Sequence, residues 1–406
     1  MHKVIEGSMA VAEAVKRCRP QVISAYPITP QTHIVEDLAQ MVADGQLKCE
    51  FVNSESEHSA ASIVLGASAA GVRTFTASSS QGILLMVEVL YNVAGLRLPV
   101  VMTCANRAVS SPLNIWNDHQ DAMACRDTGW IQLYAEDNQE VADMHFQAYR
   151  IAEDHRVLLP VMVCMDGFTL THAFEPVEIP EQEEVNRFLP DYQPVYRLDP
   201  EQPLSLGAFC EPSMYMETRY QLNRAIEQAK PVIEEVARDF EAAFGRYTGG
   251  LIEAYRMEDA RDVFVGMGSM MSNVKEMVDE LRTQGQRVGA LRVRSFRPFP
   301  GREIAEALAH AERVAVLEKA VSLGSNGILA GEIRSALALE NRALPVYGFI
   351  VGLGGRDVPH LWLQRIHERL SGPPADGIWA DLREDLLEEE QAEAWRQQWE
   401  SGISVS

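Results

Sequence analysis

The sequence predicts two α/β domains with parallel sheets, joined by a proline-rich segment. In two parts of the chain, short apolar or β-branched runs alternate with longer helical stretches, which is the pattern of strands connected by crossover helices. Between them, seven prolines fall within residues 174–212, too many for a helix or a central strand. The 406 residues allow two or three domains, and 47% of them are hydrophobic, so each domain can bury its own core.

In the first domain, residues 1–173, strands are expected at 22–25, 49–52, 74–77, 99–103 and 161–165. Helices are expected between them, for example at 31–43 and 59–70. Residues 174–258 hold the proline-rich segment and then a long helix, because apolar residues recur at three and four positions between 222 and 244. Pro231 lies inside this helix and is expected to kink it.

The second domain is expected over residues 259–370. Its strands are predicted at 262–266, 287–293 and 313–318, and its helices at 272–283 and 303–311. Residues 371–406 form an acidic tail in which a surface helix is expected to pack through Leu386, Leu387 and Trp395.

Charge and cysteine spacing exclude several classes of partner. The chain has 36 Lys and Arg against 58 Asp and Glu, a formal net charge of −22, and such a surface repels nucleic acid and anionic lipid. No apolar run approaches the ~20 residues of a transmembrane helix, and the first residues lack a signal-peptide core, which points to the cytoplasm. The six cysteines form no C-x2-C pair, so neither a zinc ribbon nor an iron-sulfur cluster is expected on this chain.

Two candidate site residues follow the first two predicted strands, and active sites of parallel sheets gather at such strand ends. Thr29, in YPITPQT, is expected to be a helix N-cap because a helix can begin at Pro30. Glu57, in NSESEHSAA, has two interpretations. It either completes a capping box with Ser54 or serves in proton transfer at the end of a strand.

Three further candidates follow the next two strands. The turn within residues 74–82 offers backbone N–H groups to a ligand, which makes Ser79 and Gln81 candidate cofactor contacts, although the turn lacks the P-loop pattern. The helix after it is apolar on nearly every side, which predicts burial at a subunit interface. Arg107 stands at a strand end, where a guanidinium can hold a carboxylate through two hydrogen bonds.

Two other stretches are discounted. The run 117–121 contains Asp and His but is better explained by turn and capping roles than by a metal, and His119 is expected to be a hydrogen-bonded structural histidine. The GMG stretch at Gly266–Gly268 lacks the rest of a dinucleotide fingerprint, so a tight packing turn is expected there.

Taken in order, the segments YPITPQT, SESEHSAA, TASSSQGILLM and NRAVSSPLNIWNDHQD resemble the α subunit of the 2-oxoacid:ferredoxin oxidoreductases, most closely the pyruvate enzymes. The resemblance implies a pyrimidine-binding domain for thiamine diphosphate in residues 1–173 and a transketolase C-terminal-like domain in residues 259–370. It also implies the reversible conversion of pyruvate and coenzyme A to acetyl-CoA and carbon dioxide, with electrons passed to ferredoxin.

The same resemblance assigns roles. Glu57 matches the catalytic glutamate that hydrogen-bonds the cofactor's pyrimidine, Arg107 matches the residue that pairs with the carboxylate of a small 2-oxoacid, and Thr29 matches a nearby substrate contact. The family places the diphosphate and its Mg²⁺ on a β subunit and 4Fe-4S clusters on partner subunits. The β, γ and δ subunits and ferredoxin are therefore the expected partners, and no metal is expected on this chain.

Three alternatives stay open. A branched-chain enzyme acting on 2-oxoisovalerate shares these motifs, although Thr29 and the bulky residues 113–116 favour a small substrate. A non-catalytic scaffold would keep the motifs for packing alone. A dinucleotide-binding dehydrogenase built on Gly266 and Gly268 would need NAD binding by this chain, which we expect to fail.

Overall fold

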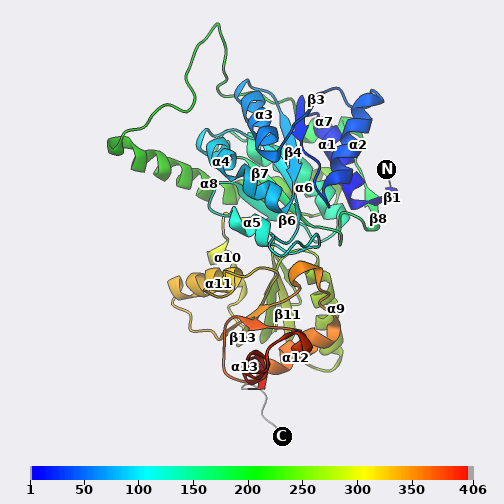
Figure 1. Ribbon diagram of the computed structural model, residues 1–406, viewed down its shortest axis with the longest axis vertical. Helices are drawn as coiled ribbons and strands as arrows, with labels where there is room; N and C mark the ends of the chain where they lie inside the picture. Colours follow the sequence, from blue (N-terminus) through cyan, green and yellow to red (C-terminus); the bar gives the residue numbers. More distant parts are fainter. Residues whose placement is uncertain (1, 401–406) are drawn as a thin grey trace.

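The computed structural model describes residues 2–400 and consists of two α/β domains, one above the other in Figure 1. A seven-stranded sheet forms the centre of the first domain and a six-stranded sheet that of the second. Most strand pairs in both sheets are parallel. The predicted fold class is confirmed.

The sheet of the first domain has the order β12-β6-β7-β5-β4-β2-β3. Its strands are β2 (Val22–Ala25), β3 (Glu50–Asn53), β4 (Thr74–Ser78), β5 (Val101–Asn106), β6 (Ile131–Tyr134), β7 (Val161–Asp166) and β12 (Ser295–Arg297). Every residue of β5 and β7 is buried, because helices cover both faces of the sheet. All five predicted strands are present within two or three residues at each end.

Helices lie on both faces of this sheet (Figure 1). They are α1 (Gly7–Cys18), α2 (Thr32–Ala43), α3 (Glu57–Ala69), α4 (Ser80–Gly95), α5 (Gln120–Ala124) and α6 (Asn138–Glu153). Alternate residues of β5 belong to different cores: Val101 packs with α1, α2 and α6, whereas Met102 packs with α3, α4 and α5. The helix after β2 therefore covers one face and the helix after β4 covers the other.

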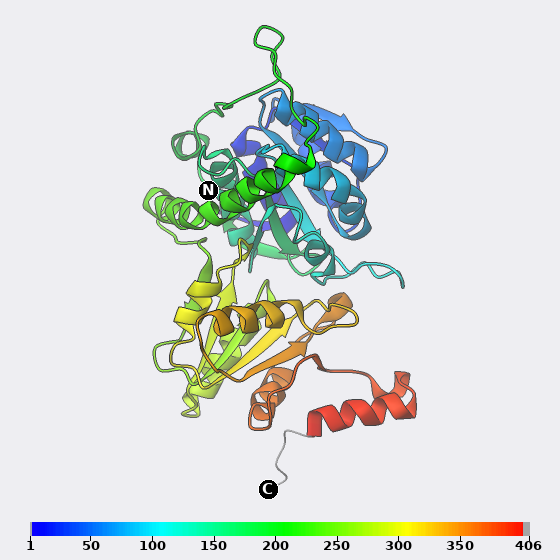
Figure 2. The ribbon, with the colours of Figure 1, turned by 90° about the vertical axis from the view of Figure 1, so that its left-hand side faces the viewer.

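The proline-rich segment is more ordered than predicted. It begins as strand β8 (Phe174–Glu178), which pairs antiparallel with β1 (His2–Glu6) in a separate two-stranded sheet, and continues as helix α7 (Gln182–Phe188). Proline is tolerated in β8 because this strand is an edge strand. Helix α8 (Pro212–Phe244) packs on the first domain from Leu222 onward, whereas its first turns project away from the domain (Figure 1). The segment before α8 also extends outward (Figure 2).

The sheet of the second domain has the order β15-β14-β13-β10-β11-β9. Its strands are β9 (Ile252–Tyr255), β10 (Asp262–Gly266), β11 (Val288–Val293), β13 (Arg313–Glu318), β14 (Val346–Ile350) and β15 (Ile378–Trp379). Its helices are α9 (Met270–Thr283), α10 (Gly301–Ala307), α11 (Ile328–Leu339), α12 (His360–Arg369) and α13 (Glu389–Glu400), with 3-10 turns at Leu353–Gly355 and Glu384–Leu386. The predicted strand 262–266 matches β10, and 313–318 matches β13.

The acidic tail packs differently from the prediction. Leu386 is 71% exposed and carries no packing role. Helix α13 instead buries Ala392 and Trp399, and Trp395 packs beside them on the core of the second sheet. The prediction that Trp395 packs on the protein is thus confirmed, and the prediction that Leu386 does so is wrong.

The two domains are joined by a shared sheet and a shared hydrophobic core. Strand β12 follows β11 in the chain but pairs antiparallel with β6 of the first sheet, with Ser295 opposite Leu133. One apolar core contains both Met123 of α5 and Phe296 and Ile304 of the second domain. The domain contact therefore contains a continuous hydrophobic core, and buried ion pairs such as Glu140–Arg292 cross it as well. Among residues 2–400, no helix has the length and apolar character needed to cross a membrane.

Candidate active site

The candidate residues meet where the strand connections of the first sheet change direction. From β2 the chain runs outward to β3, whereas from β4 it runs the other way to β5. In open α/β sheets, ligands bind at such a switch point, beyond the carboxyl ends of the strands. The loops and helix ends that follow β2, β3, β4 and β5 carry Thr29, Glu57, Ser79 and Arg107, respectively.

Glu57 is the first residue of α3, and its side chain is buried without a partner. The residue is 7% exposed, and its carboxylate makes no hydrogen bond or ion pair within residues 2–400. A Cβ atom placed on Gly82 would lie 2.7 Å from Glu57 Oε1 and 2.4 Å from Ser78 Oγ. The Ser78 hydroxyl is itself buried without a partner. Unpaired buried polar groups are costly unless a ligand satisfies them, so this corner can receive a polar ring.

The predicted capping box at Glu57 is wrong. The N-cap of α3 is Ser56, whose hydroxyl accepts the backbone N–H of Ser59 at 3.2 Å. Ser54 donates instead to the carbonyl of Ala25 at 3.2 Å. Glu57 is thus not needed to cap its helix.

Ser79 and Gln81 have side chains that are already engaged. Ser79 caps α4 by position, and its buried hydroxyl donates to the carbonyl of Ala105 at 2.5 Å. The Gln81 amide is hydrogen-bonded to Ser110 and Ser80. Both residues shape the turn, and neither points a free polar group at Glu57.

Arg107 is a buried guanidinium without an acidic partner. It is 6% exposed, and its Nε and Nη1 atoms donate to the carbonyls of Asn114 at 3.1 Å and Thr29 at 2.9 Å. No carboxylate of residues 2–400 forms an ion pair with it, and burial lowers the pKa of Arg107. The Nη2 atom accordingly has no acceptor within this range, so Arg107 can bind an anion from outside the chain.

Thr29 lies beside Arg107 through its main chain. It is exposed, and it is not an N-cap, because α2 begins at Thr32 after Gln31. Gln31 is fully buried and donates from Nε2 to the carbonyl of Ala77 at 2.7 Å, which ties the loop after β2 to β4. The Thr29 hydroxyl is left free to contact a ligand.

Asp121 organises these loops, a role that the sequence reasoning missed. It is fully buried, and its Oδ2 atom accepts the backbone N–H groups of Ser80 at 2.9 Å and Arg107 at 3.0 Å. Its Oδ1 atom accepts from Asn106 Nδ2 at 2.9 Å and from the N–H of Ala122 at 2.7 Å. Burial raises the pKa of Asp121, and the four donors oppose that shift. The N-terminus of α4 and the backbone of Arg107 therefore share one anchor.

The second domain supports the loop that holds Arg107. Asn114 donates from Nδ2 to the carbonyl of Gly354 at 3.1 Å, and Asp118 accepts the N–H of Gly354 at 3.2 Å. Gly355 has φ +81°, and a Cβ there would lie 2.3 Å from the Cβ of Trp116. This turn has glycines because its backbone approaches the loop too closely for a side chain.

His119 is hydrogen-bonded, as predicted. Its Nε2 atom lies 2.8 Å from Asp166 Oδ1, and Lys319 of the second domain lies 3.1 Å from Asp166 Oδ2. Burial alone would raise the pKa of Asp166, but Lys319 and His119 hold it well below its usual range. Gly268 packs on this cluster, since a Cβ there would lie 2.9 Å from Asp166. The GMG stretch is thus a packing turn and not an open dinucleotide loop.

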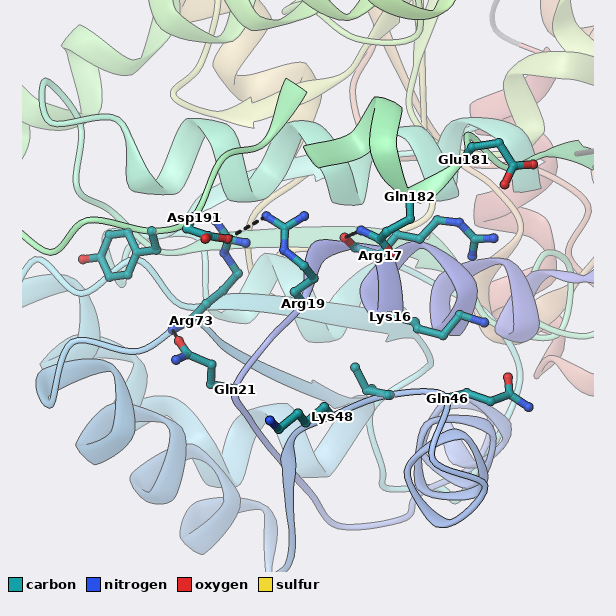
Figure 3. A pocket seen from close by; sticks show the side chains of 12 residues that line it. Lys16, Arg17, Arg19, Gln21, Gln46, Lys48, Arg73, Glu181, Gln182 and Asp191 are labelled. Atoms are coloured by element: carbon teal, nitrogen blue, oxygen red, sulfur yellow. Dashed lines mark hydrogen bonds and ion pairs between the residues drawn. The ribbon is translucent and has the colours of Figure 1, made fainter. Parts of the chain in front are cut away.

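A pocket of about 640 Å³ lies at the opposite edge of the first sheet (Figure 3). Gln21 and Arg73, which line it, precede β2 and β4, so it is at the amino ends of the strands. Most of its cations are paired within the chain: Lys16 and Arg17 with Glu13, Arg19 with Asp191, and Arg73 with Glu153. Because the pocket lies at the end of the sheet opposite to Glu57 and Arg107, it is not the candidate site.

Comparisons with known proteins point to one family. Residues 13–238 match the family model described as "Pyruvate flavodoxin/ferredoxin oxidoreductase, thiamine diP-bdg", and residues 260–360 match "Pyruvate:ferredoxin oxidoreductase core domain II". The chain is 52% identical to the pyruvate synthase subunit PorA of Methanosarcina barkeri, over 95% of this chain and 97% of that one. It is 48% identical to the ketoisovalerate oxidoreductase subunit VorA of Pyrococcus abyssi, over 87% of this chain and 90% of that one.

A solved structure shares the fold. The 2-oxoglutarate:ferredoxin oxidoreductase from Magnetococcus marinus, with 2-oxoglutarate, coenzyme A and succinyl-CoA bound, superposes with a TM-score of 0.68 at 20% identity. The match covers 90% of this chain and 65% of the other. At that identity the likeness concerns the fold alone.

Proposed function

The chain belongs to the pyruvate flavodoxin/ferredoxin oxidoreductase family, and we propose that it acts there as the α subunit of a pyruvate synthase. The reaction converts pyruvate, coenzyme A and two oxidised ferredoxins to acetyl-CoA, carbon dioxide, two reduced ferredoxins and a proton. The carboxylate of Glu57, a residue that is 7% exposed and has no hydrogen-bond or ion-pair partner within residues 2–400, is the observation that carries the proposal.

The residues around Glu57 fit the pyrimidine ring of thiamine diphosphate. When bound, this cofactor supplies the carbanion that attacks the ketone carbon of a 2-oxoacid. Glu57 would hold a proton at N1′ of the ring, which favours the tautomer needed to form that carbanion. Gly82 helps to position Glu57, because only a residue without a Cβ lets the side chains of Glu57 and Ser78 pack so closely against its backbone.

Arg107 and Thr29 would bind and orient the substrate. The free Nη2 of Arg107 can hydrogen-bond the carboxylate of the 2-oxoacid, while Nε and Nη1 keep the guanidinium in place through the carbonyls of Asn114 and Thr29. The exposed hydroxyl of Thr29 would contact the same substrate. Ser79 and Gln81, whose side chains are engaged, would shape the turn around the cofactor.

The remaining parts of the reaction are proposed to lie on other chains. A β subunit would bind the diphosphate and Mg²⁺, and the γ and δ subunits would hold 4Fe-4S clusters and pass electrons to ferredoxin. The exposed side chains of Leu85 (51%) and Tyr91 (42%) on α4 support a partner on this face. All six cysteines are free thiols, which fits a reducing compartment such as the cytoplasm.

The test is turnover of the co-expressed complex carrying Glu57→Gln or Arg107→Ala. Pyruvate-dependent ferredoxin reduction is expected to fall at least about 100-fold in either variant, because each loses a group that acts on the cofactor or the substrate. Glu55→Gln is the matched control, since Glu55 is exposed and bonded only to Ser59. Size-exclusion chromatography checks that the complex assembles. Near-normal turnover of Glu57→Gln would overturn the site assignment.

A branched-chain substrate is the second candidate, favoured by the 48% identity to the ketoisovalerate subunit. Leu113 and Trp116 are 74% and 52% exposed, so they close no substrate pocket within residues 2–400. Rates with pyruvate, 2-oxoisovalerate, 2-oxoglutarate and oxalate separate the candidates. A higher kcat/KM for 2-oxoisovalerate than for pyruvate would replace the first proposal.

A further inference from the structure

Three potential metal ligands meet in the first domain, on elements other than the helix that carries Glu57. They are Glu6 at the end of β1, His33 in the first turn of α2, and His172 in the turn after β7. One ligand atom from each lies within 4.8 Å of the other two. Residues so far apart in sequence come together here only because of the tertiary fold.

The contacts within this cluster already resemble part of a coordination shell. His33 Nδ1 lies 3.1 Å from both carboxylate oxygens of Glu6, and the rings of His33 and His172 are 4.7 Å apart. Ligand atoms around a tetrahedral zinc ion are about 3.4 Å apart, given bond lengths of about 2.0–2.1 Å. The ligand atoms of the cluster lie within 4.8 Å of one another, so a shift of about 1 Å by the 44% exposed side chain of His33 would bring them to that spacing.

The hydrogen bonding of His172 leaves one of its ring nitrogens able to bind a cation. Its Nδ1 atom lies 2.7 Å from Thr171 Oγ1, which also accepts the backbone N–H of Phe168 at 2.8 Å. When Nδ1–H donates to Thr171, the lone pair of Nε2 is available, an arrangement common for metal-bound histidine. The ring of Phe168, 4.7 Å away, fixes the plane of the imidazole.

We propose that Glu6, His33 and His172 bind a divalent metal ion of the zinc class, with water completing its coordination. Two imidazoles and one carboxylate are suitable ligands for ions of this class, which are borderline between hard and soft. They disfavour Mg²⁺ and Ca²⁺, which prefer oxygen ligands. The ion joins β1, α2 and the turn after β7. A Cβ on Gly167 in that turn would lie 2.7 Å from Pro30, so the ion also steadies the loop that carries Thr29.

The test is zinc binding by the untagged full-length chain. After equilibrium dialysis at low micromolar free Zn²⁺, mass spectrometry is expected to find one equivalent of zinc on the wild type. His172→Phe keeps the ring packed on Phe168 but removes both nitrogens, and it is expected to lose that equivalent. Zinc at about 100 times its Kd is expected to raise the melting temperature of the wild type by a few degrees and to leave His172→Phe unchanged.

Two further variants keep the result interpretable. His58→Ala is the control, because His58 is a surface histidine 4.0 Å from Glu88, and it is expected to bind zinc like the wild type. Glu6→Gln keeps the size of the side chain and is expected to weaken binding at least tenfold, which serves if His172→Phe fails to fold. A wild type without bound zinc, or equal zinc content in the wild type, His172→Phe and Glu6→Gln, would refute the proposal.

Discussion

Changing Asp121 to asparagine removes an acceptor that the backbones of Ser80 and Arg107 share. The carboxylate accepts four N–H hydrogen bonds, two at each oxygen, from the backbones of Ser80, Arg107 and Ala122 and from the amide of Asn106. The thiol of Cys104 also donates to Oδ2, at 3.7 Å. Asparagine offers one oxygen and one NH₂ group. In either orientation of the amide, two buried donors face another donor.

The magnitude follows from those two lost bonds. A buried polar group left without its partner costs about 1–3 kcal/mol, so two cost about 2–6 kcal/mol. Burial raises the pKa of Asp121, which means that the charged side chain is itself expensive to bury, and the neutral amide recovers part of the loss. We expect the free energy of unfolding to fall by about 2–4 kcal/mol.

Urea denaturation of the full-length chain, followed by circular dichroism, measures the change in stability. Pyruvate kinetics of the complex measure the displacement of Arg107, for which we expect kcat/KM to fall about 10–100-fold. Asp127→Asn is the control, because the Asp127 side chain is 69% exposed and lies no closer than 3.8 Å to a cation, so a change within about 0.5 kcal/mol is expected. If Asp121→Asn matched this control in stability and in kcat/KM, the role of Asp121 as a shared anchor would be wrong.

Two other predictions follow from the cofactor corner and the domain contact. Gly82→Ala is expected to lower the affinity for thiamine diphosphate and the turnover at least tenfold, because the added Cβ would lie 2.7 Å from Glu57 Oε1. Isothermal titration calorimetry measures this affinity. Gly95→Ala is the control, because Gly95 is exposed and a Cβ there meets nothing within 4 Å. Burial raises the pKa of Glu140, but Arg292, Arg294 and the backbone N–H of Glu136 together outweigh burial and lower that pKa to about 2. The charged Glu140 therefore contributes about 3 kcal/mol above pH 4.5, and this contribution is lost as the pH falls towards 2. Denaturation curves from pH 6 to pH 2 are expected to show this loss in the wild type and a flatter dependence in Glu140→Gln; equal slopes would count against the role of Glu140.

Local patterns predicted most of the strands. The runs that became β4, β5 and β7 are apolar because both faces of the sheet are covered, so their composition alone marks them. Strand β6 was missed because it contains a polar residue, Gln132, whose Nε2 donates to the carbonyl of Ala122 at 2.8 Å. When the hydrogen-bond partner of a polar strand residue lies on a separate helix, the sequence around that residue does not show that the residue is buried.

The candidate site, too, could be predicted from the sequence only in part. The motifs around Glu57 and Arg107 could be found in the sequence, because each follows a predicted strand. The capping assignments of Thr29 and Ser54 were wrong, because a cap depends on where the chain leaves the strand, and helix ends are set by a few dihedral angles. Asp121 was read as a turn residue, since its acceptor role depends on three separate loops.

By itself the sequence determined the α/β class, the two domains and the family of this chain, because alternating apolar runs and long motifs are local properties. Only the tertiary structure decided that Glu57 has no partner beside Gly82, that β12 joins the sheet of the first domain, and that Glu6, His33 and His172 meet. These facts depend on contacts between residues far apart in the chain. Such contacts arise when strands and helices pack, and no spacing along the sequence encodes them directly.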